Sequence, residues 1–228
     1  MEYLRKLLSN PLSEVKAINL IDIEDEFYNI AQQLFNKYCI KNDTKTFRFA
    51  EIECYYYKKN EWEEDWTQVT YPRNKNAGEL FFHYSGVDIC FQCHVDENNS
   101  DNVEFGGILI RSLIEVDDYG RLLKLHAGPQ YCANILLNTC NKELPQLNKA
   151  KEVKCDLQRT IRFGIEKSAR EREEKDDFKL CFYINQFESD LLNWQETSKR
   201  IEWKIKEGKY KESKRNYARD RFHNLKLQ

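Results

Sequence analysis

The sequence predicts an α+β fold, a single domain with a mainly antiparallel, curved sheet flanked by helices. Runs rich in aromatic and β-branched residues at 46–57, 80–95 and 105–114 are typical of strands. Ser85-Gly86 interrupts the second run as a turn would, which predicts a hairpin. Apolar residues at helical spacing between 27 and 35 predict an N-terminal helix. With 228 residues, we expect one domain over 1–198 and a basic helical C-terminal tail over 199–228.

The first half of the chain supplies most of the predicted sheet. The helix follows acidic residues at 22–26, which suit the positive end of a helix dipole. The strand at 46–57 alternates around Phe47 and Phe49 and then becomes densely apolar, as a strand entering a core does. Residues 58–76 are polar and lack a sustained period, so we expect a long loop there, and such loops are usually functional. The hairpin strands are predicted at 80–84 and 87–95, and a buried strand at 105–114.

The second half contains weaker patterns. Pro129 follows Gly128 and suits the first turn of a short helix that runs to Cys140. Residues 168–177 are a charge run, most simply a solvated helix or loop. A late strand is predicted at 178–184 and a helix at 190–205, leading into the basic tail.

The cysteines and the first ten residues bear on compartment and cofactors. Charges interrupt residues 1–10, so we expect no signal peptide, no membrane span and a cytoplasmic protein whose eight cysteines are reduced. Cys90 and Cys93, followed by His94, match the short pattern for c-type haem, but they lie in a predicted strand where packing is the simpler explanation. A zinc site would need a second pair of ligands, and no matching pair follows. We expect neither a metal nor a cofactor.

Charge is balanced in total but uneven along the chain. Residues 199–226 hold 11 basic and 4 acidic side chains, which leaves 25 basic and 34 acidic residues elsewhere. This segment predicts contact with an anion, and a nucleic-acid backbone is the commonest one. The alternative is a solvated helix face with pairs such as Glu207 and Lys211. The candidate backbone-binding residues of the tail are Lys209, Lys211, Lys214 and Arg215.

Glu53 is the candidate general base because it lies inside an aromatic strand. A buried carboxylate is costly unless a cation pairs with it, and Arg111, within another apolar run, is the candidate partner. Such a pair can activate a water molecule, or it can be purely structural. Tyr55 and His83 lie on the same predicted strands and can stack on a flipped base, although strand aromatics more often belong to a core.

Four ordered motifs between residues 45 and 116 resemble those of the alkyladenine (3-methyladenine) DNA glycosylases. They are Glu51-Ile52-Glu53-Cys54-Tyr55, Tyr71-Pro72-Arg73-Asn74, Gly78-Glu79-Leu80-Phe81-Phe82-His83 and Ile108-Leu109-Ile110-Arg111-Ser112-Leu113. Each motif is weak alone, and their shared order and spacing make the resemblance moderately specific. The resemblance implies a compact α+β domain that pinches the DNA minor groove and rotates a nucleotide into a pocket.

The resemblance also implies roles for individual residues. Glu53 matches the acid that activates the attacking water, and Arg111 matches an arginine beside that water. Tyr55 matches a base-stacking tyrosine, and His83 lies near the position of a second stacking aromatic. Arg73 and Asn74 are candidate contacts to the DNA backbone, and Glu51 is expected to be a surface or supporting residue.

This sequence departs from the family at three places. The loop before Pro72 has no histidine and offers Gln68 or Thr67 instead. Tyr84 is the nearest substitute for an intercalating tyrosine, and Asp88 adds a carboxylate that can bind an amino group of a base. These differences weaken the expectation of ordinary alkylpurine specificity.

The function predicted from the sequence is that of a monofunctional DNA N-glycosylase. It would excise a damaged or modified base, from double-stranded rather than single-stranded DNA, in repair or antiviral defence. Two alternatives stay open: a module that binds a modified base without cleaving it, and an interaction protein whose aromatics are only core. The substrate base and the oligomeric state are not predicted, and RNA is not excluded.

Overall fold

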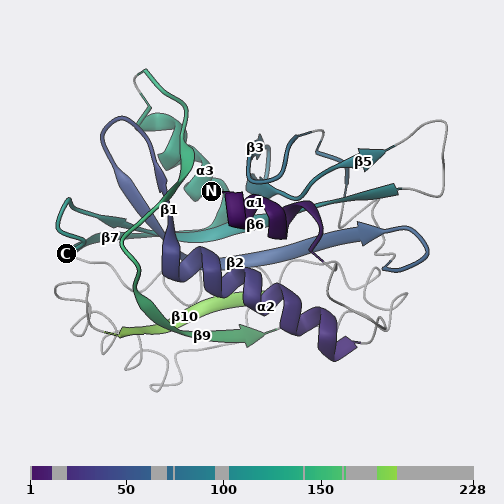
Figure 1. Ribbon diagram of the computed structural model, residues 1–228. Coiled ribbons are helices and arrows are strands. Elements are labelled where there is room, and N and C mark those ends of the chain that lie inside the picture. Colours follow the sequence, from purple (N-terminus) through teal and green to yellow (C-terminus); the bar gives the residue numbers. More distant parts are fainter. Residues whose placement is uncertain are drawn as a thin grey trace.

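The computed structural model describes residues 2–11, 20–62, 71–73, 75–95, 103–140, 142–160, 162 and 179–188. These residues form a mixed α+β fold with a curled antiparallel sheet and three helices (Figure 1). The predicted α+β class and antiparallel sheet are confirmed. The predicted helix at 190–205, the charge run at 168–177 and the basic tail at 199–228 lie outside the described residues.

The described strands join into one sheet. Its main path runs β3, β4, β6, β2, β1, β8; β10 also pairs with β2 and β9, and β5 and β7 pair with β6. The strand bounds are β1 (Tyr38–Lys41), β2 (Thr46–Lys58), β3 (Leu80–His83), β4 (Gly86–Cys90), β5 (His94–Val95), β6 (Val103–Val116), β7 (Leu122–Ala127), β8 (Gln146–Lys149), β9 (Lys154–Thr160) and β10 (Cys181–Glu188).

The two long strands β2 and β6 form the centre of the sheet. They pair from Thr46 opposite Val116 to Lys58 opposite Glu104, and the register shifts on either side of Glu51. Such an irregularity bends a strand and changes the direction of nearby side chains. Nearly all of β2 is buried, which explains why its sequence is a dense apolar run. The carboxylates within this run therefore lie inside the protein.

Helix α2 (Leu20–Lys37) covers one face of the sheet and lies across β2 in Figure 1. Phe27 meets Tyr56 edge to face, with ring centroids 5.9 Å apart, so the even-numbered residues of this part of β2 point toward the helix. Buried Arg48 donates hydrogen bonds to the carbonyl oxygens of Phe35 and Asn36. Because these are among the last carbonyls of α2, the guanidinium satisfies the end of the helix.

Two shorter helices complete the described fold. Helix α1 (Glu2–Ser9) buries Leu4 and Leu8, and the Leu8 carbonyl accepts a hydrogen bond from the Gln92 amide. Helix α3 (Pro129–Asn138) packs against β4 and β6 and has Pro129 in its first turn, as predicted. No described helix is long and apolar enough to cross a membrane.

One predicted strand is wrong in its extent. The strand expected at 87–95 stops at Cys90, and β5 resumes only at His94. Between them the fully buried Phe91 packs against Phe27 and Tyr56. The Phe91 amide still donates to the Gly106 carbonyl of β6, but the next amide, that of Gln92, donates to the Leu8 carbonyl of α1, so the strand is interrupted where its backbone bonds to the helix.

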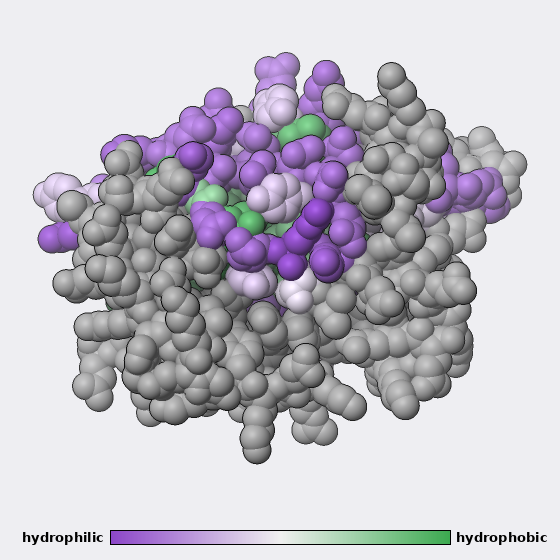
Figure 2. All heavy atoms as spheres, turned by 90° about the horizontal axis from the view of Figure 1, so that it is seen from below, coloured by the Kyte–Doolittle hydropathy of each residue, from purple (hydrophilic) through white to green (hydrophobic). Residues whose placement is uncertain are grey.

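Seen from below, the described surface is mostly hydrophilic, with only small hydrophobic patches between charged and polar side chains (Figure 2). That view shows no broad apolar patch among the described residues. The candidate site lies on the face of the sheet opposite α2.

Candidate active site

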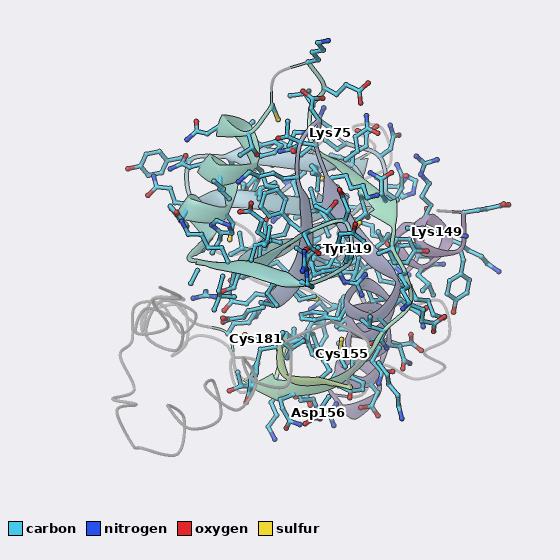
Figure 3. The ribbon with its side chains drawn as sticks, turned by 90° about the vertical axis from the view of Figure 1, so that its left-hand side faces the viewer. Lys75, Tyr119, Lys149, Cys155, Asp156 and Cys181 are labelled. Carbon is cyan, nitrogen blue, oxygen red and sulfur yellow. The ribbon has the colours of Figure 1, made fainter. Side chains whose placement is uncertain are left out.

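The candidate site lies on a row of side chains that crosses five strands. The register places Cys181 opposite Glu53, Glu53 opposite Leu109, Leu109 opposite Asp88, and Asp88 opposite Phe81. Directly paired residues point to the same face of a sheet, so Glu53 and Asp88 share a face with Leu109 between them. In Figure 3, β10 with Cys181 lies at the opposite end of the molecule from Lys75, which precedes β3.

Arg111 joins the two glutamates of β2. Its Nη1 lies 2.9 Å from Glu53 Oε2, and its Nε lies 3.2 Å from Glu51 Oε1. Burial lowers the pKa of Arg111, but the charges of Glu53 and Glu51 outweigh that effect and raise this pKa above its usual value. All three side chains are almost completely buried. The predicted pairing of Glu53 with Arg111 is present, and Glu51 is a buried partner of the same guanidinium, so a surface position for Glu51 is wrong.

Tyr55 completes the surroundings of Glu53. Its hydroxyl donates a hydrogen bond of 2.7 Å to Glu53 Oε2, the same oxygen that faces Arg111. Burial raises the pKa of Tyr55 well above its usual value, and the neighbouring Glu53 raises it further. The hydroxyl therefore keeps its proton and stays a donor. Two donors thus converge on one oxygen of Glu53.

The ring of Tyr55 carries a cation on one face. The guanidinium carbon of Arg162 lies 4.8 Å from the ring centroid, within cation–π range. Arg162 also donates a hydrogen bond of 2.9 Å to the carbonyl oxygen of Cys54 and is buried. Stacking of a base on Tyr55 would use the opposite face of the ring or require Arg162 to move.

A second buried cluster lies two strands away, around Asp88. Arg73 Nε donates a hydrogen bond of 2.6 Å to Asp88 Oδ2, and His83 Nε2 lies 3.4 Å from Asp88 Oδ1. Burial raises the pKa of Asp88, but the adjacent His83 ring and Arg73 guanidinium outweigh that effect and lower this pKa below its usual value. Asp88 is therefore an ionised carboxylate at neutral pH.

Gly107 makes room for the Arg73 side chain. A Cβ atom on Gly107 would lie 2.6 Å from Arg73 Nε, too close for contact. Gly107 is the neighbour of Tyr55 on β2 and of Cys90 on β4. The Arg73 guanidinium consequently lies against the sheet between the Glu53 cluster and the Asp88 cluster.

Aromatic rings border the Asp88 cluster. The ring of His83 stacks on Phe81 with centroids 5.8 Å apart and meets Tyr71 edge to face at 6.1 Å. The centroid of the Tyr71 ring also lies 4.6 Å from the guanidinium carbon of Arg73. In contrast, Tyr84 at the turn between β3 and β4 is 93% exposed. One ring is thus presented to solvent beside a group of packed rings.

The structure brings together five of the predicted site residues, in two neighbouring clusters: Glu53, Arg111, Tyr55, His83 and Asp88. Arg73, predicted to touch the DNA backbone, instead lies buried beside Asp88, and Tyr84 lies at the surface. The other predicted residues lie outside the described part of the chain: Gln68, Asn74, Lys209, Lys211, Lys214 and Arg215.

Sequence reasoning missed two members of the site. Arg162 follows β9 closely, and nothing in its local sequence indicates contact with Tyr55, 107 residues earlier in the chain. Cys181 lies beside both glutamates of β2, and burial and these carboxylates raise the pKa of its thiol well above its usual value. The thiol is therefore protonated and donates a hydrogen bond of 3.6 Å to Glu51 Oε1.

Charge on this sheet face is balanced. Three carboxylates and three guanidinium groups gather there: Glu51, Glu53, Asp88, Arg73, Arg111 and Arg162. Buried charges are tolerated when they are paired in this way. Among the described residues, no group of three or more His, Cys, Asp or Glu side chains could hold a metal ion.

Comparison with known proteins adds no assignment. Neither a scan against protein-family models nor a search of curated proteins finds a match for this sequence. The function is therefore argued from the chemistry of the site.

Proposed function

We propose that this protein is a DNA N-glycosylase that flips a damaged or modified base out of the duplex and hydrolyses its bond to the sugar. The observation that carries the proposal is buried Glu53, held between the Arg111 guanidinium at 2.9 Å and the Tyr55 hydroxyl at 2.7 Å. A buried carboxyl group held by a guanidinium and a hydroxyl donor is suited to act as a general base. The resemblance of residues 45–116 to the alkyladenine glycosylases supports the same assignment.

Glu53 would act on a water molecule next to the flipped nucleotide. The water oxygen attacks the sugar C1′ as the bond from C1′ to the base nitrogen breaks, and Glu53 accepts a proton from the water. The departing base takes the electron pair of that bond and a proton from solvent, and Glu53 then returns its proton to solvent, which leaves an abasic site. Arg111 and Tyr55 hold the Glu53 carboxyl group in place. This route uses no lysine nucleophile, so strand cleavage by a lyase step is not expected.

DNA binding is proposed for two other parts of the chain. Tyr84, 93% exposed beside His83, is suited to fill the gap that a flipped base leaves in the stack. The basic segment 199–228 supplies charge for contact with phosphates. Its deletion is expected to weaken duplex binding and to flatten the dependence of affinity on salt; an unchanged salt slope contradicts this part of the proposal.

The experiment that tests the activity uses duplexes that each carry one damaged or modified base. After incubation, hot alkali converts abasic sites into strand breaks, which a denaturing gel resolves. We expect breaks from the unaltered protein on at least one duplex and none from Glu53→Gln. The matched control is Glu79→Gln, which changes an exposed carboxylate outside the site and should keep full activity.

A binding module that does not cleave the base is the second candidate. The observation that favours it is the Arg162 guanidinium on the Tyr55 ring, because one stacking face is already occupied. Tight binding to a modified duplex, with no alkali-labile sites under any condition, would support this module and contradict the glycosylase. A role in repair or in defence against viral DNA would follow from which base is recognised.

A further inference from the structure

Two buried polar atoms beside the Glu53 cluster have no hydrogen-bond partner among the described residues. They are Asp88 Oδ1 and His83 Nε2, which lie 3.4 Å apart. The Asp88 side chain is 1% exposed, so its oxygen lies away from bulk solvent. A buried polar atom left without a partner costs about 1–3 kcal/mol, so each such atom needs an explanation, and a bound ligand that supplies the missing bond is one.

The neighbouring contacts fix what each atom can offer. Arg73 occupies Oδ2 of Asp88, which leaves Oδ1 as a charged acceptor. Ser85 Oγ lies 2.9 Å from His83 Nδ1. When the serine hydroxyl donates to Nδ1, the neutral ring carries its hydrogen on Nε2. His83 Nε2 is then a hydrogen-bond donor, and the neighbouring Asp88 Oδ1 is an acceptor.

A nucleobase edge with the complementary order has a ring nitrogen that accepts and an adjacent amino group that donates. Cytosine and adenine have such an amidine edge, whereas uracil and hypoxanthine have a lactam edge with the order reversed. We propose that His83 and Asp88 read the amidine edge of a flipped cytosine-type or adenine-type base, with Asp88 accepting from the amino group. This specificity rests on the proposed base-flipping function.

The surrounding charges argue against a cationic alkylpurine as the substrate. Each nearby carboxylate already faces a guanidinium, and Arg162 occupies one face of the Tyr55 ring. A positively charged base would meet no uncompensated carboxylate and would lie near a buried cation. A neutral base that donates through its amino group fits the same surroundings.

The test measures binding separately from excision. Duplexes carry cytosine, uracil, adenine or hypoxanthine at one position, opposite a tetrahydrofuran abasic analogue, so that no base pair has to be broken in any of them. A 2′-fluoroarabino sugar at that position resists hydrolysis, and affinity is read by fluorescence anisotropy. We expect the affinity to be about 10- to 100-fold higher for cytosine than for uracil, for adenine than for hypoxanthine, or in both comparisons. Which pair is discriminated shows whether the base is a pyrimidine or a purine.

Two variants test the residues. Asp88→Asn offers an amide hydrogen in place of a carboxylate oxygen, so preference should move toward the lactam base. Ser85→Ala, at an exposed position, removes the hydroxyl beside His83 Nδ1 and should reduce the preference severalfold while leaving the fold intact. Circular dichroism checks that each variant is folded. If Asp88→Asn does not fold, the binding preference of Ser85→Ala still tests the proposal.

The outcomes separate this inference from the glycosylase proposal. Equal binding of amidine and lactam bases, no binding of any duplex, or an unchanged preference in Ser85→Ala overturns the reading of the base edge. Excision from the matching duplexes with ordinary sugars then shows independently whether the protein is a glycosylase. If the protein discriminates amidine from lactam bases but excises none, the inference on base reading stands and the glycosylase proposal is contradicted. If it excises a base without discriminating between them, the glycosylase proposal stands and the inference is contradicted.

Discussion

Replacing Arg111 with methionine should expose how strongly the site depends on one guanidinium. Arg111 faces Glu53 at 2.9 Å and Glu51 at 3.2 Å, and both carboxylates are fully buried. Removal of one partner from a buried ion pair leaves an uncompensated charge and typically costs about 3–5 kcal/mol. Because Arg111 pairs with two carboxylates, we expect the loss of stability in Arg111→Met to lie toward the upper end of this range. For a chain of this length the loss corresponds to a fall in Tm of about 6–20 °C.

Denaturant unfolding at pH 7 measures this loss in free energy. Lys37→Met is the control, because Lys37 pairs with Glu152 at the surface at 3.7 Å, and exposed pairs contribute less than about 1 kcal/mol. Adding Glu51→Gln and Glu53→Gln to Arg111→Met should restore much of the stability, since the whole charged group is then gone. Arg111→Met within about 1 kcal/mol of the unaltered protein would refute the view that this ion pair supports the site.

Three further changes test other parts of the structure. Burial lowers the pKa of His126 despite its hydrogen bond to Glu115, so the unfolded chain binds a proton more readily than the folded protein does. The free energy of unfolding should therefore fall as the pH drops below about 6.5. In thermal scans, His126→Gln should flatten that fall, whereas the control His94→Gln, at an exposed position, should not. Gly107→Ala puts a Cβ 2.6 Å from Arg73 Nε and should destabilise the protein by about 1–3 kcal/mol in denaturant unfolding; a neutral result would contradict the packing. Tyr84→Ala should change stability by less than about 0.5 kcal/mol yet weaken duplex binding in anisotropy, and unchanged binding would exclude the proposed wedge.

The strongest predictions from sequence were those in which local pattern and burial agree. The dense run of β2 and the apolar run of β6 were predicted as strands, and the embedded Glu53 and Arg111 could be paired because a buried charge needs a partner. The short helix after Gly128 followed from Pro129 in the first turn. In each case one physical requirement left few alternatives.

The missed elements are short or lack an apolar period. β8 buries one of its four residues, and β9 buries only Leu157, so neither carries the alternation that predicts a strand. The site residues that were missed depend on tertiary contacts: Arg162 reaches Tyr55 across the sheet, and β10 brings Cys181 opposite Glu53. Glu51 could be predicted only as a surface or supporting residue, because the register shift beside it, which accompanies its contact with Arg111, is invisible in the sequence.

The central claim is that Glu53 activates the water that releases a base. The most direct measurement is mass spectrometry of free base released from a modified duplex in a single turnover, comparing Glu53→Gln with Glu51→Gln. Both changes remove a buried carboxylate that faces Arg111, but only Glu53 also accepts the Tyr55 hydrogen bond. We expect Glu51→Gln to release the base measurably and Glu53→Gln to reduce release by at least about 100-fold. Equal release by the two variants would contradict the assignment of Glu53 as the general base.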